Sequence, residues 1–144
     1  MGKKRIVKQE GQRADKSLKD RALARTSKKR ITKGVLYIQS SYNNTVVTLT
    51  DERGNSVMAS SSGALGFRGA KKGTPYASAK VGELLGEKAT IMGIKEVDIV
   101  VKGVGAGRES AIRGFISHGI VPVRISDTTP VPHNGVRPKK PRRV

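Results

Sequence analysis

The residues best suited to chemistry lie together in one turn, Lys102-Gly103-Val104-Gly105-Ala106-Gly107-Arg108-Glu109-Ser110. An apolar, β-branched run precedes the turn, and a helix-like pattern follows it. A strand, a glycine-rich turn and a helix start together present backbone N–H groups that can bind phosphate. Lys102 and Arg108 add positive charge. The turn therefore predicts a phosphate site, for a nucleotide cofactor or for a nucleic-acid backbone, unless its glycines serve only to pack a tight turn.

The spacing of these glycines separates the two kinds of phosphate. It is G-x-G-x-G, whereas a dinucleotide-binding turn has G-x-G-x-x-G and an acidic residue about twenty positions further on. A P-loop has Lys followed by Ser or Thr after its last glycine, and Arg108 stands there instead. The sequence thus favours a nucleic-acid backbone bound by Lys102, Gly103, Gly105, Gly107 and Arg108. It predicts no cofactor and no small-molecule substrate.

A second candidate contact is the basic, glycine-rich loop from Gly63 to Gly73. Phe67, Arg68, Lys71 and Lys72 lie within it, and they combine an aromatic face with positive charge. This combination suits phosphate contact and stacking on an unpaired base. The alternative is a solvated loop whose Phe67 turns into the core.

A third candidate is a cluster of polar side chains at a predicted hairpin tip, made of Ser40, Ser41, Asn43, Asn44 and Thr45. Their hydroxyl and amide groups can bond phosphate or the ribose 2′-OH. Side-chain capping of the turn explains them almost as well. Asn43 and Asn44 are the predicted RNA contacts of this cluster.

Catalytic and metal chemistry has no comparable support. The two histidines, His118 and His133, lie far apart and have no second ligand at metal spacing. The carboxylate pairs are Asp51/Glu52, Glu83/Glu87 and Glu96/Asp98. No set of nucleophile, base and orienting group can be assembled from them. The chain has no cysteine, which fits a reducing compartment and leaves no thiolate metal site. We therefore expect no enzyme and no metal.

The elements that must position these residues can be predicted from periodicity. Apolar and β-branched runs predict five strands, at 34–40, 45–51, 56–61, 96–102 and 120–127. Short turns join the first three into an antiparallel meander. Pro122 places the last strand near a sheet edge or its own start.

Two helices complete the pattern. Thr74 and Pro75 predict the start of the first, which runs to about Met92 before Gly93. Gly82 and Gly86 lie four residues apart on it and predict a close approach to the sheet. The second helix spans about 108–117. Helices alternating with strands predict right-handed crossovers, so the fold class is a mixed five-stranded α/β sheet.

Charge divides the chain into three parts. The net charge is +18, yet residues 34–128 hold 11 basic and 8 acidic residues. Residues 1–33 hold 13 basic and 3 acidic residues, and residues 129–144 hold 5 basic and none acidic. Such arms repel themselves and bury little, so the N-terminal arm is expected to be disordered when free and the Pro-containing tail to be extended. Nucleic acid is the favoured polyanion, in a cytoplasmic protein with no membrane segment.

Several stretches, all in order over residues 34–144, together resemble the bacterial form of the universal small-subunit ribosomal protein eleven family. They are Ser40 to Thr45 (SSYNNT), Gly66 to Gly69 (GFRG), Thr74 to Ala77 (TPYA), Val101 to Gly103 with Gly105 and Gly107 to Ser110, Ile125 to Pro130 (ISDTTP), Pro132 to Gly135 (PHNG) and Pro138 to Val144 (PKKPRRV). Bacterial members often have proline between the turn glycines, where this chain has Val104 and Ala106.

The resemblance implies a structural protein of the small-subunit platform with an RNase-H-like fold that lacks the nuclease carboxylates. It implies binding to small-subunit (16S-type) rRNA, near the messenger exit path and the messenger–rRNA 3′-end helix. Small-subunit ribosomal proteins seven and eighteen are the implied neighbours. In the tail, the expected rRNA contacts are His133, Asn134, Arg137, Lys139, Lys140, Arg142 and Arg143.

Asn134 is also a candidate for isoaspartate formation, because Gly135 offers little steric hindrance to succinimide closure. We expect purified protein to contain isoaspartate at this position. Peptide mapping with an isoaspartate-specific methyltransferase assay checks this, and Gly135→Ala is the control that should suppress the signal. Finding only Asn in aged wild-type protein would contradict the prediction.

Overall fold

The computed structural model describes residues 20–21, 23–24 and 30–143. The expected disorder of the N-terminal arm falls largely on residues outside these ranges. The folded elements are β1 (Lys33–Ser40), β2 (Thr45–Thr50), β3 (Ser56–Ser61), the 3-10 helix η1 (Gly69–Gly73), α2 (Pro75–Met92), β4 (Glu96–Lys102), α3 (Gly107–Ile116) and β5 (Val121–Asp127). They agree with the predicted elements to within one or two residues, except that η1 occupies part of the predicted loop.

The five strands form one sheet in the order β3-β2-β1-β4-β5. β1 pairs antiparallel with β2, and β2 pairs antiparallel with β3. β4 pairs in parallel with both β1 and β5. The predicted mixed α/β sheet is thereby confirmed. Pro122 lies in the edge strand β5, as predicted, and the register against β4 shifts beside it.

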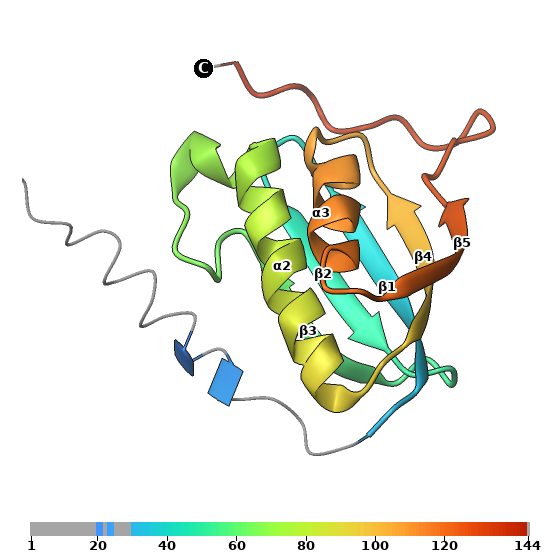
Figure 1. Cartoon of the computed structure of the whole chain (residues 1–144). Coiled ribbons are helices and arrows are strands. Elements are labelled where there is room, and N and C mark those ends of the chain that lie inside the picture. The colour runs from blue at the N-terminus through green and yellow to red at the C-terminus, as the bar shows by residue number, and fades with distance from the viewer. Residues whose placement is uncertain (1–19, 22, 25–29, 144) are drawn as a thin grey trace, which may run out of the picture.

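Both helices cover the same face of the sheet (Figure 1). Alternate residues of the central strands point toward them, so Leu36, Ile38 and Ile99 are almost fully buried. Tyr37, between two of these, is 43% exposed on the other face. Each large apolar side chain buried in this way contributes about 1.5–3 kcal/mol. One layer of helix against one layer of sheet thus makes the core.

The ends of α2 follow the local chemistry of the sequence. The Thr74 hydroxyl accepts a hydrogen bond from the Ala77 N–H at 3.3 Å, and Pro75 occupies the first turn. Gly93 ends the helix in a left-handed conformation, with φ of 85°. These contacts confirm the predicted boundaries and fix the direction in which the N-terminus of α2 points.

The glycines of α2 approach the other helix and not the sheet, so the predicted partner was wrong. A Cβ at Gly82 would lie 2.3 Å from the Ala111 carbonyl oxygen of α3, and one at Gly86 would lie 2.8 Å from that of Phe115. Gly114 of α3 is equally close to Ala79 of α2. The reason is that Val81 and Leu85 of α2 point into the hydrophobic core, which leaves the small residues for the helix pair.

Candidate nucleic-acid interface

Four segments that are distant in sequence meet where β1 and β4 end. They are the β1–β2 hairpin tip, the glycine turn between β4 and α3, the first turn of α2, and the start of the C-terminal tail. The Gly105 N–H donates to the Ser40 carbonyl oxygen at 3.0 Å, and the Thr128 N–H donates to that of Val101 at 2.9 Å. In an open α/β sheet, this end of parallel strands is where ligands usually bind.

The glycines of the turn are packed against the hairpin tip. A Cβ at Gly103 would lie 2.0 Å from the Ser40 carbonyl oxygen, and one at Gly105 would lie 2.2 Å from that of Ser41. A Cβ at Gly107 would lie 1.9 Å from the Ser78 hydroxyl of α2. These glycines are therefore needed for packing, as expected if they serve to form a tight turn. Their predicted contact with RNA stays a prediction.

Buried hydroxyl groups join the hairpin tip to α2. The Thr45 Oγ1 lies 2.7 Å from the Ser78 Oγ and 3.3 Å from the Ser40 Oγ, and Ser78 donates to the Thr74 carbonyl. Ser40, Thr45 and Ser78 are at most 1% exposed. Ser40 and Thr45 therefore do not face a ligand, so the structural interpretation holds for these two polar residues of the tip.

The other three polar residues of the tip either cap the turn or are at least partly exposed. The Ser41 hydroxyl bonds both the N–H and the carbonyl of Asn44 at 3.1 Å, which caps the turn as the alternative interpretation expected. Asn43 is exposed and Asn44 is half-buried. Their side chains remain the candidate RNA contacts of this segment.

The side chain of Arg108 is bound to other residues of the same chain. Its guanidinium donates to the Gly103 carbonyl oxygen and to the Asp127 carboxylate. Asp127 also accepts from the Thr129 hydroxyl at 2.6 Å and from the Thr129 N–H at 2.9 Å. Arg108, with Thr129 as the second donor, holds the pKa of Asp127 well below its usual range. Arg108 thus ties the glycine turn to the end of β5, a role that sequence reasoning missed because its partner lies nineteen residues away.

Other basic side chains lie at this end. In the part of the chain that the structure describes, Arg68, Lys71, Lys72 and Lys102 form no ion pair. Arg68 is the N-cap residue of η1, and Lys71 and Lys72 lie in its last turn. Positive charge is therefore free to meet phosphate around η1 and at the end of β4.

Phe67 lies half-buried beside this basic loop, in contact with another aromatic residue. Its ring centroid is 6.0 Å from that of Tyr76, and the two rings meet edge to face at 84°. Tyr76 is 64% exposed and was not a predicted site residue. The signal that could have found it is its place directly after Thr74-Pro75, at the exposed start of a helix.

The C-terminal tail leaves β5 at the same end of the sheet (Figure 1). It has no helix or strand between Thr128 and Arg143. All of its predicted contacts are exposed, namely His133, Asn134, Arg137, Lys139, Lys140, Arg142 and Arg143. Asn134 has φ of 54° and is the one non-glycine residue of the described part in the left-handed region. Isoaspartate formation there stays a prediction.

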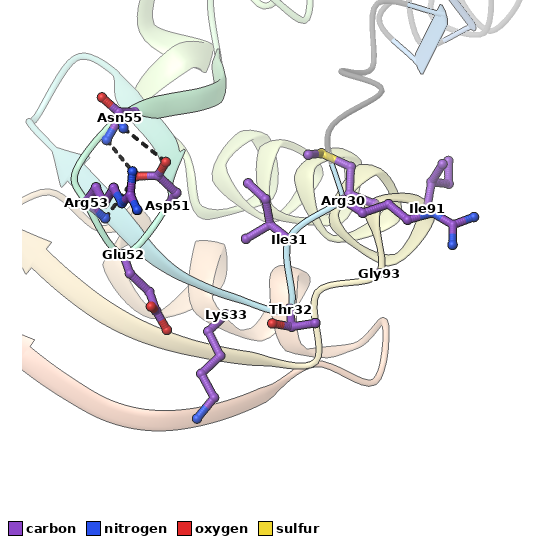
Figure 2. A pocket seen from close by; sticks show the side chains of 11 residues that line it. Arg30, Ile31, Thr32, Lys33, Asp51, Glu52, Arg53, Asn55, Ile91 and Gly93 are labelled. Atoms are coloured by element: carbon purple, nitrogen blue, oxygen red, sulfur yellow. Dashed lines mark hydrogen bonds between the residues drawn. The ribbon is translucent and has the colours of Figure 1, made fainter.

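The opposite end of the molecule carries a pocket with different chemistry (Figure 2). It has a volume of about 830 Å³, and its lining includes Arg30, Asp51, Glu52, Arg53 and Ile91. The Asp51 carboxylate accepts hydrogen bonds from the backbone N–H groups of Arg53 and Asn55, at 3.0 and 2.8 Å, so it shapes the β2–β3 turn. None of the predicted site residues lines this pocket.

The described residues were also compared with the features of metal sites and of membrane-spanning helices. Among the described residues, no group of three or more His, Cys, Asp or Glu side chains is placed to hold a metal ion. No helix in the same residues is long and apolar enough to cross a bilayer.

Substituting Asp127→Asn should destabilise the end of the sheet, because Arg108 and Thr129 lose the charge that orients them. The folded-state pKa is lowered, so this stabilisation is complete above the ordinary Asp pKa of about 4 and is lost as the pH falls below it. Urea midpoints of variant and wild type should differ at pH 7 and converge as the pH falls below 4.

Asp98→Asn is the matched control, because the Asp98 carboxylate lies 3.5 Å from the Arg124 guanidinium, and the side chains of Arg124 and Asp98 are 72% and 36% exposed. Its effect should be small, as is usual for exposed pairs. An Asp127→Asn midpoint equal to that of wild type at pH 7 would contradict the role of the Arg108 contact.

Residues 34–143 match the family model described as ribosomal protein S11. The match covers the whole sheet, both helices and nearly all of the tail. It leaves out the N-terminal arm. Proteins of this family are structural, non-enzymatic components of the small ribosomal subunit and bind its rRNA. This chain belongs to the ribosomal protein S11 family.

Proposed function

We propose that this chain is a scaffold of the small-subunit platform in cytoplasmic ribosomes, where it helps assembly and translation. In this proposal it binds 16S-type rRNA near the messenger exit path and the messenger–rRNA 3′-end helix. Small-subunit ribosomal proteins seven and eighteen are its proposed neighbours. The observation that carries the proposal is that basic side chains without an ion pair among the described residues gather with the basic tail at one end of a fold whose core charge is nearly balanced.

The backbone adds to this attraction. α3 begins at Gly107 with Ala106 at its N-cap position, and no side chain caps it. Its first N–H groups are therefore available to an anion, which the helix dipole favours. Lys102 ends the strand that leads into the turn and is exposed. The turn can thus bind phosphate through the backbone of α3 although its own glycines are packed inward.

The packing argues against a nucleotide-dependent enzyme as the alternative. Gly105 and Gly107 are buried against the hairpin and α2, so a pyrophosphate has no space beside them. A general RNA-binding chaperone is the remaining alternative. It is distinguished by equal affinity for random RNA and a small-subunit rRNA fragment at near-physiological salt.

Binding to the rRNA fragment should be strongly salt-dependent. With ~6–10 phosphate contacts, affinity is expected to fall by about 10³–10⁵ between 50 and 200 mM salt. Replacing Lys71 and Lys72 with Ala should reduce the slope of log affinity against log salt by about 1 for each contact removed. Filter binding or fluorescence anisotropy over a salt series measures both quantities.

Lys33→Ala is the control, because Lys33 pairs with Glu96 at 2.8 Å at the other end of the sheet. Its salt slope should equal that of wild type. An unchanged slope for the Lys71 and Lys72 variant, or binding that does not depend on salt, would count against the electrostatic account.

A further inference from the structure

Aromatic and basic side chains surround η1 in a way that the phosphate contacts do not explain. Tyr42 at the hairpin tip is 78% exposed and Tyr76 on α2 is 64% exposed. The hairpin backbone reaches η1, since a Cβ at Gly73 would lie 2.2 Å from the Tyr42 carbonyl oxygen. Lys71 and Lys72 belong to η1, which follows Tyr42 and precedes Tyr76 along the chain. Neither lysine forms an ion pair in the described part of the chain.

The ring of Tyr76 is oriented without being buried. Phe67 meets it edge to face, and the Lys80 Nζ lies over the ring at 5.6 Å from its centroid. Lys80 is held there by Glu83, whose carboxylate lies 2.8 Å from the Nζ. Contacts of these kinds favour a fixed ring orientation. Because the ring is already ordered, a flat partner that stacks on it loses little further entropy on binding.

The charge around the ring selects the kind of partner. Arg68, Lys71 and Lys72 precede Tyr76 within nine positions, and no acidic residue lies between Arg68 and Tyr76. The nearby Glu83 is already paired with Lys80. The partner must therefore combine negative charge with a flat π face. Single-stranded RNA has both, whereas the bases of a duplex are stacked on their neighbours.

We propose that Tyr76 stacks on an unpaired nucleobase of the rRNA, while Arg68, Lys71 and Lys72 bind the flanking phosphates. This subsite rests on the proposed rRNA-binding function and adds its first base-directed contact. In this proposal the stacking ring is that of Tyr76 and not that of Phe67, because Phe67 is half-buried and packs against Tyr76 with the two rings nearly perpendicular.

The test compares two fluorescein-labelled 12-nucleotide RNAs, one with all its bases and one with abasic sugars in the central positions. Both carry the same phosphates, so only the first can stack. Tyr76→Leu removes the π face and keeps an apolar contact for Phe67, and Tyr76→Phe keeps the π face. Tyr37→Leu is the matched control, because Tyr37 alternates with the buried Leu36 and Ile38 and so lies on the other face of β1. Thermal unfolding of each variant checks that the fold is retained.

Tyr76→Leu should bind the base-containing RNA roughly 5- to 150-fold more weakly than wild type does, the range expected for losing one stacked base. It should bind the abasic RNA like wild type. Tyr76→Phe and Tyr37→Leu should stay within about twofold of wild type on both RNAs, since stacking needs only the ring.

If Tyr76→Leu lost affinity equally for both RNAs, or lost none for either, the stacking subsite would be overturned. Contact of this surface with a neighbouring protein would then be the interpretation. Failure of wild type to bind a small-subunit rRNA fragment would instead overturn the proposed function. The two failures are therefore distinguishable.

Discussion

The close approach of the glycine turn to the hairpin tip is the constraint on which the functional end of this protein depends. The backbone of Gly103 and Gly105 lies directly against the carbonyl groups of Ser40 and Ser41, where no side chain fits. That contact places the start of α3 beside the start of α2, because Gly107 in turn packs on Ser78. Arg108 then fixes the turn to the end of β5. One backbone contact thus brings two helix N-termini and the tail to one end.

This arrangement places several basic side chains at the functional end. Buried hydroxyl groups and small residues fill the inside of the functional end, while Lys71 and Lys102 are exposed there and Lys72 is half-buried. At the opposite end, Lys33 is paired with Glu96, and the neighbouring carboxylates of Glu52 and Asp98 also raise the pKa of Lys33. The functional end also has an ion pair, Arg108 with Asp127, but Arg68, Lys71, Lys72 and Lys102 pair with no acidic side chain of the described residues. The proposed rRNA contact uses the charge of these side chains.

The fold could be predicted from the sequence because its signals are local. Alternating apolar residues mark the strands, and Thr74, Pro75 and Gly93 mark the limits of α2. The close contact between α2 and α3 could not be predicted, since a glycine such as Gly82 allows close packing against either a sheet or a helix. Arg108 shows the same limit at the site: its charge indicated RNA, but its partner Asp127 becomes a neighbour only when β5 joins the sheet. Tyr76 was missed because a single tyrosine carries no periodic signal.

The central claim is that rRNA meets the end of the fold where η1, the glycine turn and the tail gather. Cross-linking followed by mass spectrometry, on small subunits that contain this chain, tests it most directly. We expect RNA cross-links on peptides that carry Lys71, Lys72 and the tail from Arg137 to Arg143, and few on the β2–β3 turn around Arg53. Cross-links concentrated at Arg53 and Lys95, with the η1 peptides free of RNA, would contradict it.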